Sequence, residues 1–469
     1  MELWAIVPEL IIAGACLVLV VTAAFTRDRR PWVPSVLLAI ALLAAMIASA
    51  RMLGRPAIAV FEGTYAVDRL GEVFKLIVLA GAAIGLCVLA AVRPGRMLAQ
   101  APVALAFITL GGIGLTSSLD LALIILFIQM ISIASYVLVA LIHERRPALE
   151  AALKYFLYGA VALAIMAYGL TFLYGLTGSL DLRAIGAGLR GADGVWIAFA
   201  VALTVAGYGF EIALVPLHFW APDTLEGAPA PIAGVVAVLP KLGAFAGLVR
   251  LLVYLPEEAW RPIVAAVAAL SMTFGNVAAL RQTRLKRLLA YSSIAQAGYV
   301  LMATATLARS ASALGAVAFY LAAYLFMNLG AFAVVARIEQ DDDTDAIAVT
   351  RGLGYRARIQ GLALTLALLS LAGIPPLAGF VGKVLLLDAA IVGGMTWLAI
   401  VGAVNMVVGL AYYVRVIAAV YTPAAYEVRP HRQLRYALAF GLTVAGMIVL
   451  GVLPETVLGW MHLPGQFVR

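Results

Sequence analysis

Charged residues are scarce in this sequence. Asp, Glu, Lys and Arg make up 12% of the 469 residues, whereas 64% are hydrophobic. A soluble domain carries about 25% charged residues, so the composition excludes a chain built mainly of soluble domains. A helix that spans a bilayer needs about 20 apolar residues, and such runs follow one another almost from end to end. We therefore expect a single polytopic membrane domain over residues 1–469.

Cysteine and histidine are also rare, with two and four residues. Cys16 and Cys87 both fall inside apolar runs and there is no CxxC motif, which argues against an iron–sulfur or zinc site. His218 has no second His or Cys at ligand spacing. The sequence thus predicts neither a metal site nor a redox cofactor in this chain.

Two features that suggest soluble ligands fail in context. The formal net charge is +8, but the basic residues are scattered through short loops, which fits the positive-inside rule better than nucleic-acid binding. Gly186, Gly188 and Gly191 form a GxGxxG pattern. No strand precedes it and no βαβ unit surrounds it, so a dinucleotide site is not indicated.

Apolar runs and helix breakers predict an all-α membrane fold with about fourteen spans, and the span lengths exclude a β-barrel. Most loop Lys and Arg residues lie on the face opposite the N-terminus, so we expect both termini outside the cytoplasm. The predicted spans are approximately 4–25, 33–50, 72–92, 100–116, 121–142, 151–175, 195–217, 229–254, 261–280, 288–307, 312–336, 359–387, 394–420 and 434–453.

The seventh and eighth spans meet at a Pro-rich loop, and each carries an ionisable residue, Glu211 or Lys241. A charge inside a membrane helix costs roughly 3 to more than 10 kcal/mol, so such residues usually mark ion or proton pathways. Pro216 and Pro240 each free the carbonyl four residues back. Freed backbone at membrane depth is tolerated only against protein or a water-filled cavity. We therefore expect the function to lie here.

The twelfth span repeats this design. Gly373, Pro375 and Pro376 break the helix, Lys383 follows inside the span, and Asp388 lies five residues later. A kink explains the glycine and prolines but not a lysine at mid-span. Burial disfavours the charged form of an amine, so a buried lysine of this kind could exchange a proton near neutral pH.

A broken helix beside an ionisable residue in each half is typical of transporters built from two inverted repeats. The first repeat would cover about 100–254 and the second about 261–420. Helices at 1–92 and 434–453 would flank them. The breaks would lie in spans 7 and 12.

Weaker site candidates lie in other spans. Gln129, in the fifth span, could simply bond a neighbouring helix. Glu150 and Lys154 have the favourable i,i+4 order of a helix ion pair, which a surface pair would share. His218, in the loop of the broken helix, could line a hydrated cavity and relay protons.

A basic hinge joins the ninth and tenth spans and includes Lys286. Anchoring of the topology explains its charges but not the polar residues that continue inward, Tyr291, Ser292, Ser293 and Gln296. Three other ionisable residues are expected to be structural. Glu9 would be a helix-start carboxylate near the interface, and Lys75 and Arg250 would snorkel to the headgroups.

Four pieces of the sequence together resemble one family. They are VPLHFWAPDTLEGAPAP, the Lys241 inside the next span, RQTRLKRLLAYSSIAQAGY and AGIPPLAGFVGK. With these pieces the chain resembles, over nearly its whole length, the antiporter-like membrane subunits of bacterial NADH:quinone oxidoreductase, respiratory complex I. It looks more like subunit N than like the sister subunits L and M.

The resemblance implies proton translocation in the bacterial inner membrane, beside other membrane-arm subunits. It implies that a central row of mid-membrane charges, connected by water, carries the protons. Lys241 matches the lysine of the family's eighth helix, and Lys383 matches the lysine of the broken twelfth helix, the usual outlet site. NADH, FMN, iron–sulfur clusters and quinone would belong to partner subunits, so no cofactor is expected in this chain.

Two positions depart from the family. It normally pairs a glutamate in the fifth helix with a lysine in the seventh, whereas this sequence has Gln129 and Glu211 there. The pair could be rewired, with Glu211 now a partner of Lys241, or proton transfer through this half could be weakened.

Two alternative functions remain. The same fold would serve a subunit of a multi-subunit Na⁺/H⁺ antiporter or of a membrane-bound hydrogenase. A subunit that has lost pumping and serves only assembly would explain Gln129 and Glu211, but the retained Lys241 and Lys383 argue against it.

Overall fold

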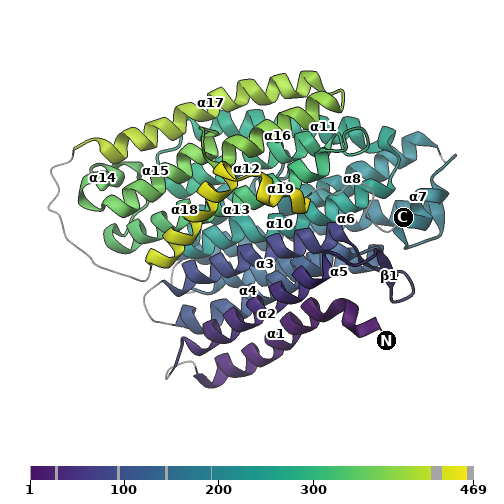
Figure 1. The fold of residues 1–469 in the computed structure, drawn as a ribbon, viewed down its shortest axis with the longest axis horizontal. Helices are drawn as coiled ribbons and strands as arrows, with labels where there is room; N and C mark the ends of the chain where they lie inside the picture. The colour runs from purple at the N-terminus through teal and green to yellow at the C-terminus, as the bar shows by residue number, and fades with distance from the viewer. Residues whose placement is uncertain are drawn as a thin grey trace.

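The protein is described by a computed structural model, which covers residues 2–26, 30–91, 96–142, 146–191, 193–423 and 436–461. Long helices run nearly parallel across the molecule (Figure 1). In this part of the chain eleven spans are long and apolar enough to cross a membrane. Their helices are α1 (Val7–Thr26, preceded by the 3-10 turn η1, Glu2–Ile6), α2 (Val33–Met52), α3 (Arg69–Ala90), α4 (Arg96–Ser117), α5 (Leu121–Ala140), α6 (Arg146–Thr177), α8 (Gly194–Ile212), α10 (Ala230–Tyr254), α11 (Glu257–Ala279), α13 (Ala313–Asp342) and α17 (Thr396–Tyr421).

The remaining predicted spans also have helical counterparts. The tenth is α12 (Leu285–Thr304), the fourteenth is α18 (Ala437–Val452), and the twelfth is a pair, α15 (Arg358–Ala372) and α16 (Ala378–Val392). The all-α membrane fold is therefore confirmed. Shorter elements connect these helices: β1 (Ile58–Val60), β2 (Tyr65–Val67), α7 (Leu182–Gly188), α9 (Trp220–Gly227), η2 (Ile347–Thr350), α14 (Leu353–Arg356) and α19 (Glu455–Met461).

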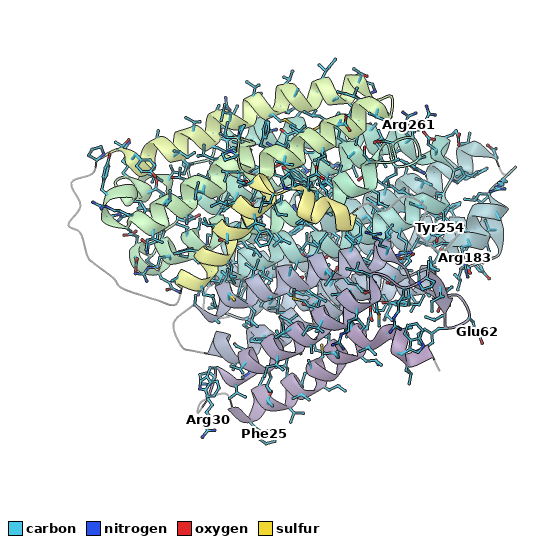
Figure 2. All side chains as sticks on the ribbon, in the orientation of Figure 1. Phe25, Arg30, Glu62, Arg183, Tyr254 and Arg261 are labelled. Atoms are coloured by element: carbon cyan, nitrogen blue, oxygen red, sulfur yellow. The ribbon has the colours of Figure 1, made fainter. Side chains whose placement is uncertain are left out.

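The two ends of the bundle are distinct. Figure 2 shows Glu62, Arg183, Tyr254 and Arg261 at one end, which we call the N-terminal face, and Phe25 and Arg30 toward the other, the opposite face. Several basic residues that entered the orientation argument lie outside the described residues: Arg27, Arg29, Arg93, Arg145, Arg429, Arg432, Arg435 and Arg469.

Two helices form the centre of the bundle. In α10 every residue from Ala230 to Leu252 is buried, and α13 is buried over most of its length. A helix that is apolar on all sides belongs in a core, and α10 packs against α3, α4, α8 and α13. Gly243 permits this packing, because a Cβ there would lie 2.7 Å from the Cα of Gly112 on α4. Figure 1 shows α10 and α13 between the α1–α4 layer and the layer of α15, α16 and α17.

The seventh and twelfth spans are broken by the same backbone device. α8 ends at Ile212 and α15 at Ala372, and the next residue is left-handed in each case, Ala213 at φ 64° and Gly373 at φ 89°. The N–H groups of Ala213 and Leu214 bond the carbonyls of Phe210 and Gly209. The N–H groups of Gly373 and Ile374 likewise bond those of Ser370 and Leu369. Both ends are thus Schellman motifs.

The eighth span is one continuous helix, in agreement with its predicted range of 229–254. α10 continues through Pro240, so Lys241 lies inside an unbroken helix. The seventh helix, by contrast, stops at Ile212, five residues before its predicted end. The break therefore begins at Ala213, two residues after Glu211.

A β-hairpin, which the sequence did not predict, lies on the N-terminal face. β1 pairs antiparallel with β2, with Ile58 opposite Val67 and Val60 opposite Tyr65. Its tight turn places Phe61, Glu62 and Gly63 at positive φ. The hairpin places the Tyr65 hydroxyl in contact with Glu9 on α1. The chain then continues into Asp68, the N-cap of α3.

Candidate functional site

Lys241 is buried at the centre of the bundle. It is 2% exposed, and its Nζ donates to the hydroxyl of Ser293 on α12 and, at 3.3 Å, to the Ser293 carbonyl. The Ser293 hydroxyl also bonds Tyr324 on α13 at 2.7 Å. The Tyr324 hydroxyl in turn donates to the Ala237 carbonyl at 3.0 Å and accepts from Asn328 at 2.9 Å. Lys241 thus lies in a polar group formed by α10, α12 and α13.

Lys383 occupies the break in the twelfth span. Its Nζ donates to the carbonyls of Leu371 at 2.7 Å and Ala372 at 2.9 Å. These are carbonyls of the last turn of α15, which have no partner inside the helix. The ammonium also lies 5.0 Å from the centre of the Tyr299 ring, where a cation is attracted to the ring face. The broken helix therefore supplies the ligands that hold a buried cation.

The helix α12 connects the two lysines. Ser293 contacts Lys241, and one turn later Gln296 donates to the Leu371 carbonyl at 3.1 Å, the same carbonyl that Lys383 contacts. Gln296 also donates to Tyr413 at 3.0 Å and accepts from Tyr320. Of the polar residues that continue inward from the basic hinge, Ser293 therefore contacts Lys241, and Gln296 shares a backbone carbonyl with Lys383.

This polar region continues beyond Lys383 toward α11 and α17. Tyr299 accepts a hydrogen bond from Asn276 at 3.1 Å, and Asn276 accepts one from Tyr412 at 3.0 Å. Tyr413, next to Tyr412, bonds both Ser292 and Gln296. Hydroxyl and amide groups thus extend from α13 to α17 through the second half of the chain.

Glu211 is the buried acid of the first half. It is 1% exposed, and one carboxylate oxygen accepts a hydrogen bond from Ser132 at 2.8 Å, while the other has no partner in the described part of the chain. Gln129, one turn before Ser132 on α5, is half-buried and makes no hydrogen bond to Glu211 in that part. The hypothesised direct pairing of Glu211 with Lys241 is absent there too, since Lys241 bonds Ser293 instead.

Aromatic packing fixes the loop after Glu211. Trp220 donates from its indole to the Phe210 carbonyl at 2.8 Å and stacks on Tyr155, with ring centres 4.2 Å apart. His218 is 4% exposed and lies between the rings of Phe219 and Phe274, each 4.5 Å away. Two aromatic rings therefore pack against His218, and its role as a proton relay stays a prediction.

Ion pairs join three helices at the opposite face of the bundle. Lys154 bonds Glu150 at 2.8 Å and reaches Asp223 on α9 at 3.3 Å. Asp223 also accepts from Arg287 at 3.0 Å. The pair Glu150–Lys154 is thus real and belongs to a network that ties α6, α9 and α12 together.

Lys286 lies beside this network but is buried, at 4% exposed. Its Nζ donates to the Ala228 carbonyl at 2.9 Å and to Glu339 on α13 at 3.0 Å. Glu339 also accepts from the backbone N–H of Ala230 at 2.7 Å, at the start of α10. Lys286 therefore fixes the position at which α10 begins.

Asp388 is not brought to Lys383, although both lie on α16. It is exposed, and within the described residues no hydrogen bond or ion pair joins it to Lys383, which bonds the Leu371 and Ala372 carbonyls. In the described ranges, no group of three His, Cys, Asp or Glu side chains is placed to hold a metal ion.

The expectation that Lys75 and Arg250 snorkel to the headgroups is wrong, because both are buried, whereas Glu9 lies in the first turn of α1 as expected. Lys75 is fully buried and forms ion pairs with Glu9 at 2.8 Å and Glu72 at 2.7 Å. Arg250 is 1% exposed and donates to both oxygens of Asp68, at 2.6 and 2.9 Å. The i,i+3 spacing of Glu72 and Lys75 inside an apolar run was the sequence signal for this cluster.

The chain is similar to a family model, to known proteins and to solved structures. A family model described as NADH:quinone oxidoreductase/Mrp antiporter, transmembrane, matches residues 118–409. The NADH-quinone oxidoreductase subunit N of Anaeromyxobacter sp. is 36% identical, with 98% of this chain and 96% of that protein aligned. The NAD(P)H-quinone oxidoreductase subunit 2 of Microcystis aeruginosa is 40% identical, over 83% of this chain and 77% of that protein. A chain of respiratory complex I from Thermus thermophilus is 35% identical, with a TM-score of 0.82, over 96% of this chain and 98% of that chain.

Proposed function

Because this chain belongs to the antiporter-like membrane subunits of NADH:quinone oxidoreductase, we propose that it moves protons along a row of buried side chains in which Lys241 and Lys383 are the exchanging groups. It is a subunit of an oxidoreductase complex, and other membrane subunits of that complex are its partners.

One observation carries the assignment of residues. Two buried amines, on α10 and α16, are joined through polar groups on one helix, α12. Ser293 and Gln296 keep the space between Lys241 and Lys383 polar, and polar interior space can hold ordered water. A proton released by one lysine would pass through water in this region to the other.

The electrostatic coupling between the lysines makes the proton occupancy of one depend on that of the other. At an effective dielectric of about 20, a unit charge still acts over 10 Å with an energy of more than 1 kcal/mol. Protonation of Lys241 therefore disfavours the charged form of Lys383, and the reverse also holds. A charge change that a partner subunit imposes at one end would travel along the row as successive proton shifts.

Electron transfer belongs to the partner subunits in this proposal. The chain itself holds no redox cofactor, and NADH, FMN, iron–sulfur clusters and quinone are bound elsewhere in the complex. The complex lies in the bacterial inner membrane, with both termini of this chain on the periplasmic side.

The two-repeat architecture is part of the same proposal. The Schellman ends of α8 and α15 support it, since each is followed by a short break and then a further helix. The repeats would cover about 100–254 and 261–420. Glu211 lies at the first break, while Lys383 lies after the second.

Replacement of Lys383 by Ala tests the proposal. NADH-driven proton uptake is measured in inverted membrane vesicles, with Arg358→Ala as the control, because Arg358 is an exposed cation at the start of α15. We expect loss of pumping for Lys383→Ala and normal pumping for Arg358→Ala. If Lys383→Ala pumps normally in an assembled complex, the subunit serves assembly and not pumping.

The first half of the chain needs its own test, because Glu211 has Ser132 and not a cation as its partner. The variants are Glu211→Gln alone and Glu211→Lys combined with Gln129→Glu, which restores the usual family pair. Loss of pumping in the first and pumping in the second would show that Glu211 is a working part of a rewired path. Normal pumping in both would remove the first half from the proton route.

The antiporter and hydrogenase alternatives differ in their partners. A chain that works with NADH:quinone oxidoreductase subunits should co-purify with NADH:quinone reductase activity from its native membrane. Co-purification with Na⁺/H⁺ antiporter subunits or with hydrogenase activity instead would overturn the proposal.

A further inference from the structure

A second group of buried ionisable side chains lies in the layer of α1, α2 and α3, at the N-terminal face. Figure 1 shows this layer on the far side of α10 and α13 from α15 and α16, which hold Lys383. The group consists of Glu9 on α1, Tyr65 on β2, and Glu72 and Lys75 on α3, with the hydroxyl of Ser49 on α2 as a polar neighbour. The proposed proton row does not include any of them.

Lys75 is the centre of this group. Its Nζ lies 2.8 Å from Glu9 Oε1 and 2.7 Å from Glu72 Oε1. The other oxygen of Glu72 accepts from Ser49 at 2.5 Å. Both oxygens of Glu72 are therefore occupied, and its carboxylate is fully paired without an added proton.

Glu9 is bonded differently. Its Oε1 accepts from Lys75 and, at 2.7 Å, from the hydroxyl of Tyr65. Its Oε2 is buried and has no hydrogen-bond partner within the described residues. A buried acceptor oxygen without a hydrogen-bond partner costs about 1–3 kcal/mol, and more when its group is charged.

The charges around this group do not balance. Asp68 and Arg250 neutralise each other in a two-point ion pair, which leaves Glu9 and Glu72 to share the single positive charge of Lys75. The other cations of this face are engaged elsewhere or exposed: Arg69 donates to the Gly459 carbonyl, Arg55 lies over the Trp4 ring, and Arg51 is exposed. With both glutamates ionised, a net negative charge would remain in a buried site, and uptake of a proton removes it.

From the charge count and the unpartnered oxygen, we propose that Glu9 Oε2 is a second proton-binding site of this protein, which exchanges with water at the N-terminal face. The proton adds to Oε2 to give a neutral acid, while both oxygens of Glu72 keep their contacts with Lys75 and Ser49. Glu9 is the member nearest the surface, since it is 8% exposed, whereas Glu72 and Lys75 are 0% exposed.

The helix α3 also contacts the helix of Lys241. Asp68 is the N-cap of α3, four residues before Glu72, and it bonds Arg250 on α10. Arg250 follows Lys241 by nine residues, or roughly 13 Å along the axis at 1.5 Å per residue. The same helix thus contacts Glu9 through Lys75 and α10 through Asp68.

Infrared difference spectroscopy of the purified complex tests the site at equilibrium. A protonated carboxyl has a C=O band that carboxylates lack and that shifts in D2O. We expect the complex with Glu9→Gln to lose one such band, and that with Glu258→Gln, an exposed glutamate on the same face, to keep it. An unchanged set of bands in Glu9→Gln would overturn the proposal.

Tyr65→Phe gives an independent readout if Glu9→Gln fails to assemble. The phenol donates to Oε1, which is the carbonyl oxygen of the protonated acid. Loss of that hydrogen bond should shift the band to higher frequency without removing it. A band that does not move would show that the protonated carboxyl is not Glu9. The measurement needs no turnover, so it does not depend on the proposed pumping through Lys241 and Lys383.

Discussion

Gln296 is the side chain on which the proposed link between the two lysines depends. It makes three hydrogen bonds, to the Leu371 carbonyl, to Tyr413 and from Tyr320. Gln296→Met keeps nearly the same volume but removes all three. An interhelical hydrogen bond in a membrane protein contributes about 0.6 kcal/mol on average, so the loss is roughly 2 kcal/mol. If the whole of this loss raises the activation free energy of proton transfer, the rate of transfer falls by about 30-fold.

The assay is the initial rate of NADH-driven proton uptake in inverted vesicles. Uncoupled electron flow is measured in parallel, so that a loss of assembled complex is seen separately. Gln282→Met is the matched control, because Gln282 lies in the loop before α12 and its amide bonds only the Ala278 carbonyl. Gln296→Asn, which is polar but shorter, should keep part of the activity. Equal pumping by Gln296→Met and wild type would refute the link through α12.

Three further substitutions follow from particular contacts. Arg250→Met removes the cation that pairs with the buried Asp68 carboxylate, so we expect a loss of about 3–5 kcal/mol in stability, seen as a lower thermal-unfolding midpoint. Addition of Asp68→Asn should recover most of it, and failure of this rescue would contradict the ion-pair argument. Gly379→Ala places a Cβ 1.8 Å from the Ser370 carbonyl, so α16 must shift and pumping should fall although no charge changes; Gly175→Ala, with open space around it, should pump normally. Ala213→Gly relieves a left-handed alanine and should stabilise the complex by about 1 kcal/mol in a thermal-unfolding assay, whereas a lower midpoint would show that the alanine methyl packs favourably.

The sequence was most informative where a charge interrupts an apolar run. Lys241, Lys383 and Glu211 stand out for this reason, and all three are buried. Pro375 and Gly373 located the break in the twelfth span for the same local reason, since both residues interrupt a helix. Local signals of this kind need no knowledge of how distant helices pack.

Contacts between distant segments were beyond such signals. Nothing near Lys75 in the sequence shows that Glu9, on another helix, lies 2.8 Å away, so the lysine seemed free to reach the headgroups. The hydrogen bond from Tyr324 of α13 to the Ala237 carbonyl of α10 is a contact of the same kind, since nothing near Ala237 in the sequence points to α13. Ser132, the actual partner of Glu211, is a small neutral residue that no pattern singles out.

The number of protons moved per two electrons, measured in proteoliposomes with the complex carrying Lys241→Met, tests the central claim most directly. Lys241 is held by Ser293, and methionine fills the same space without an exchangeable proton. The account predicts a lower ratio than in wild type, with the complex assembled and electron transfer still measurable under uncoupling. A ratio equal to that of wild type would contradict a proton route through Lys241.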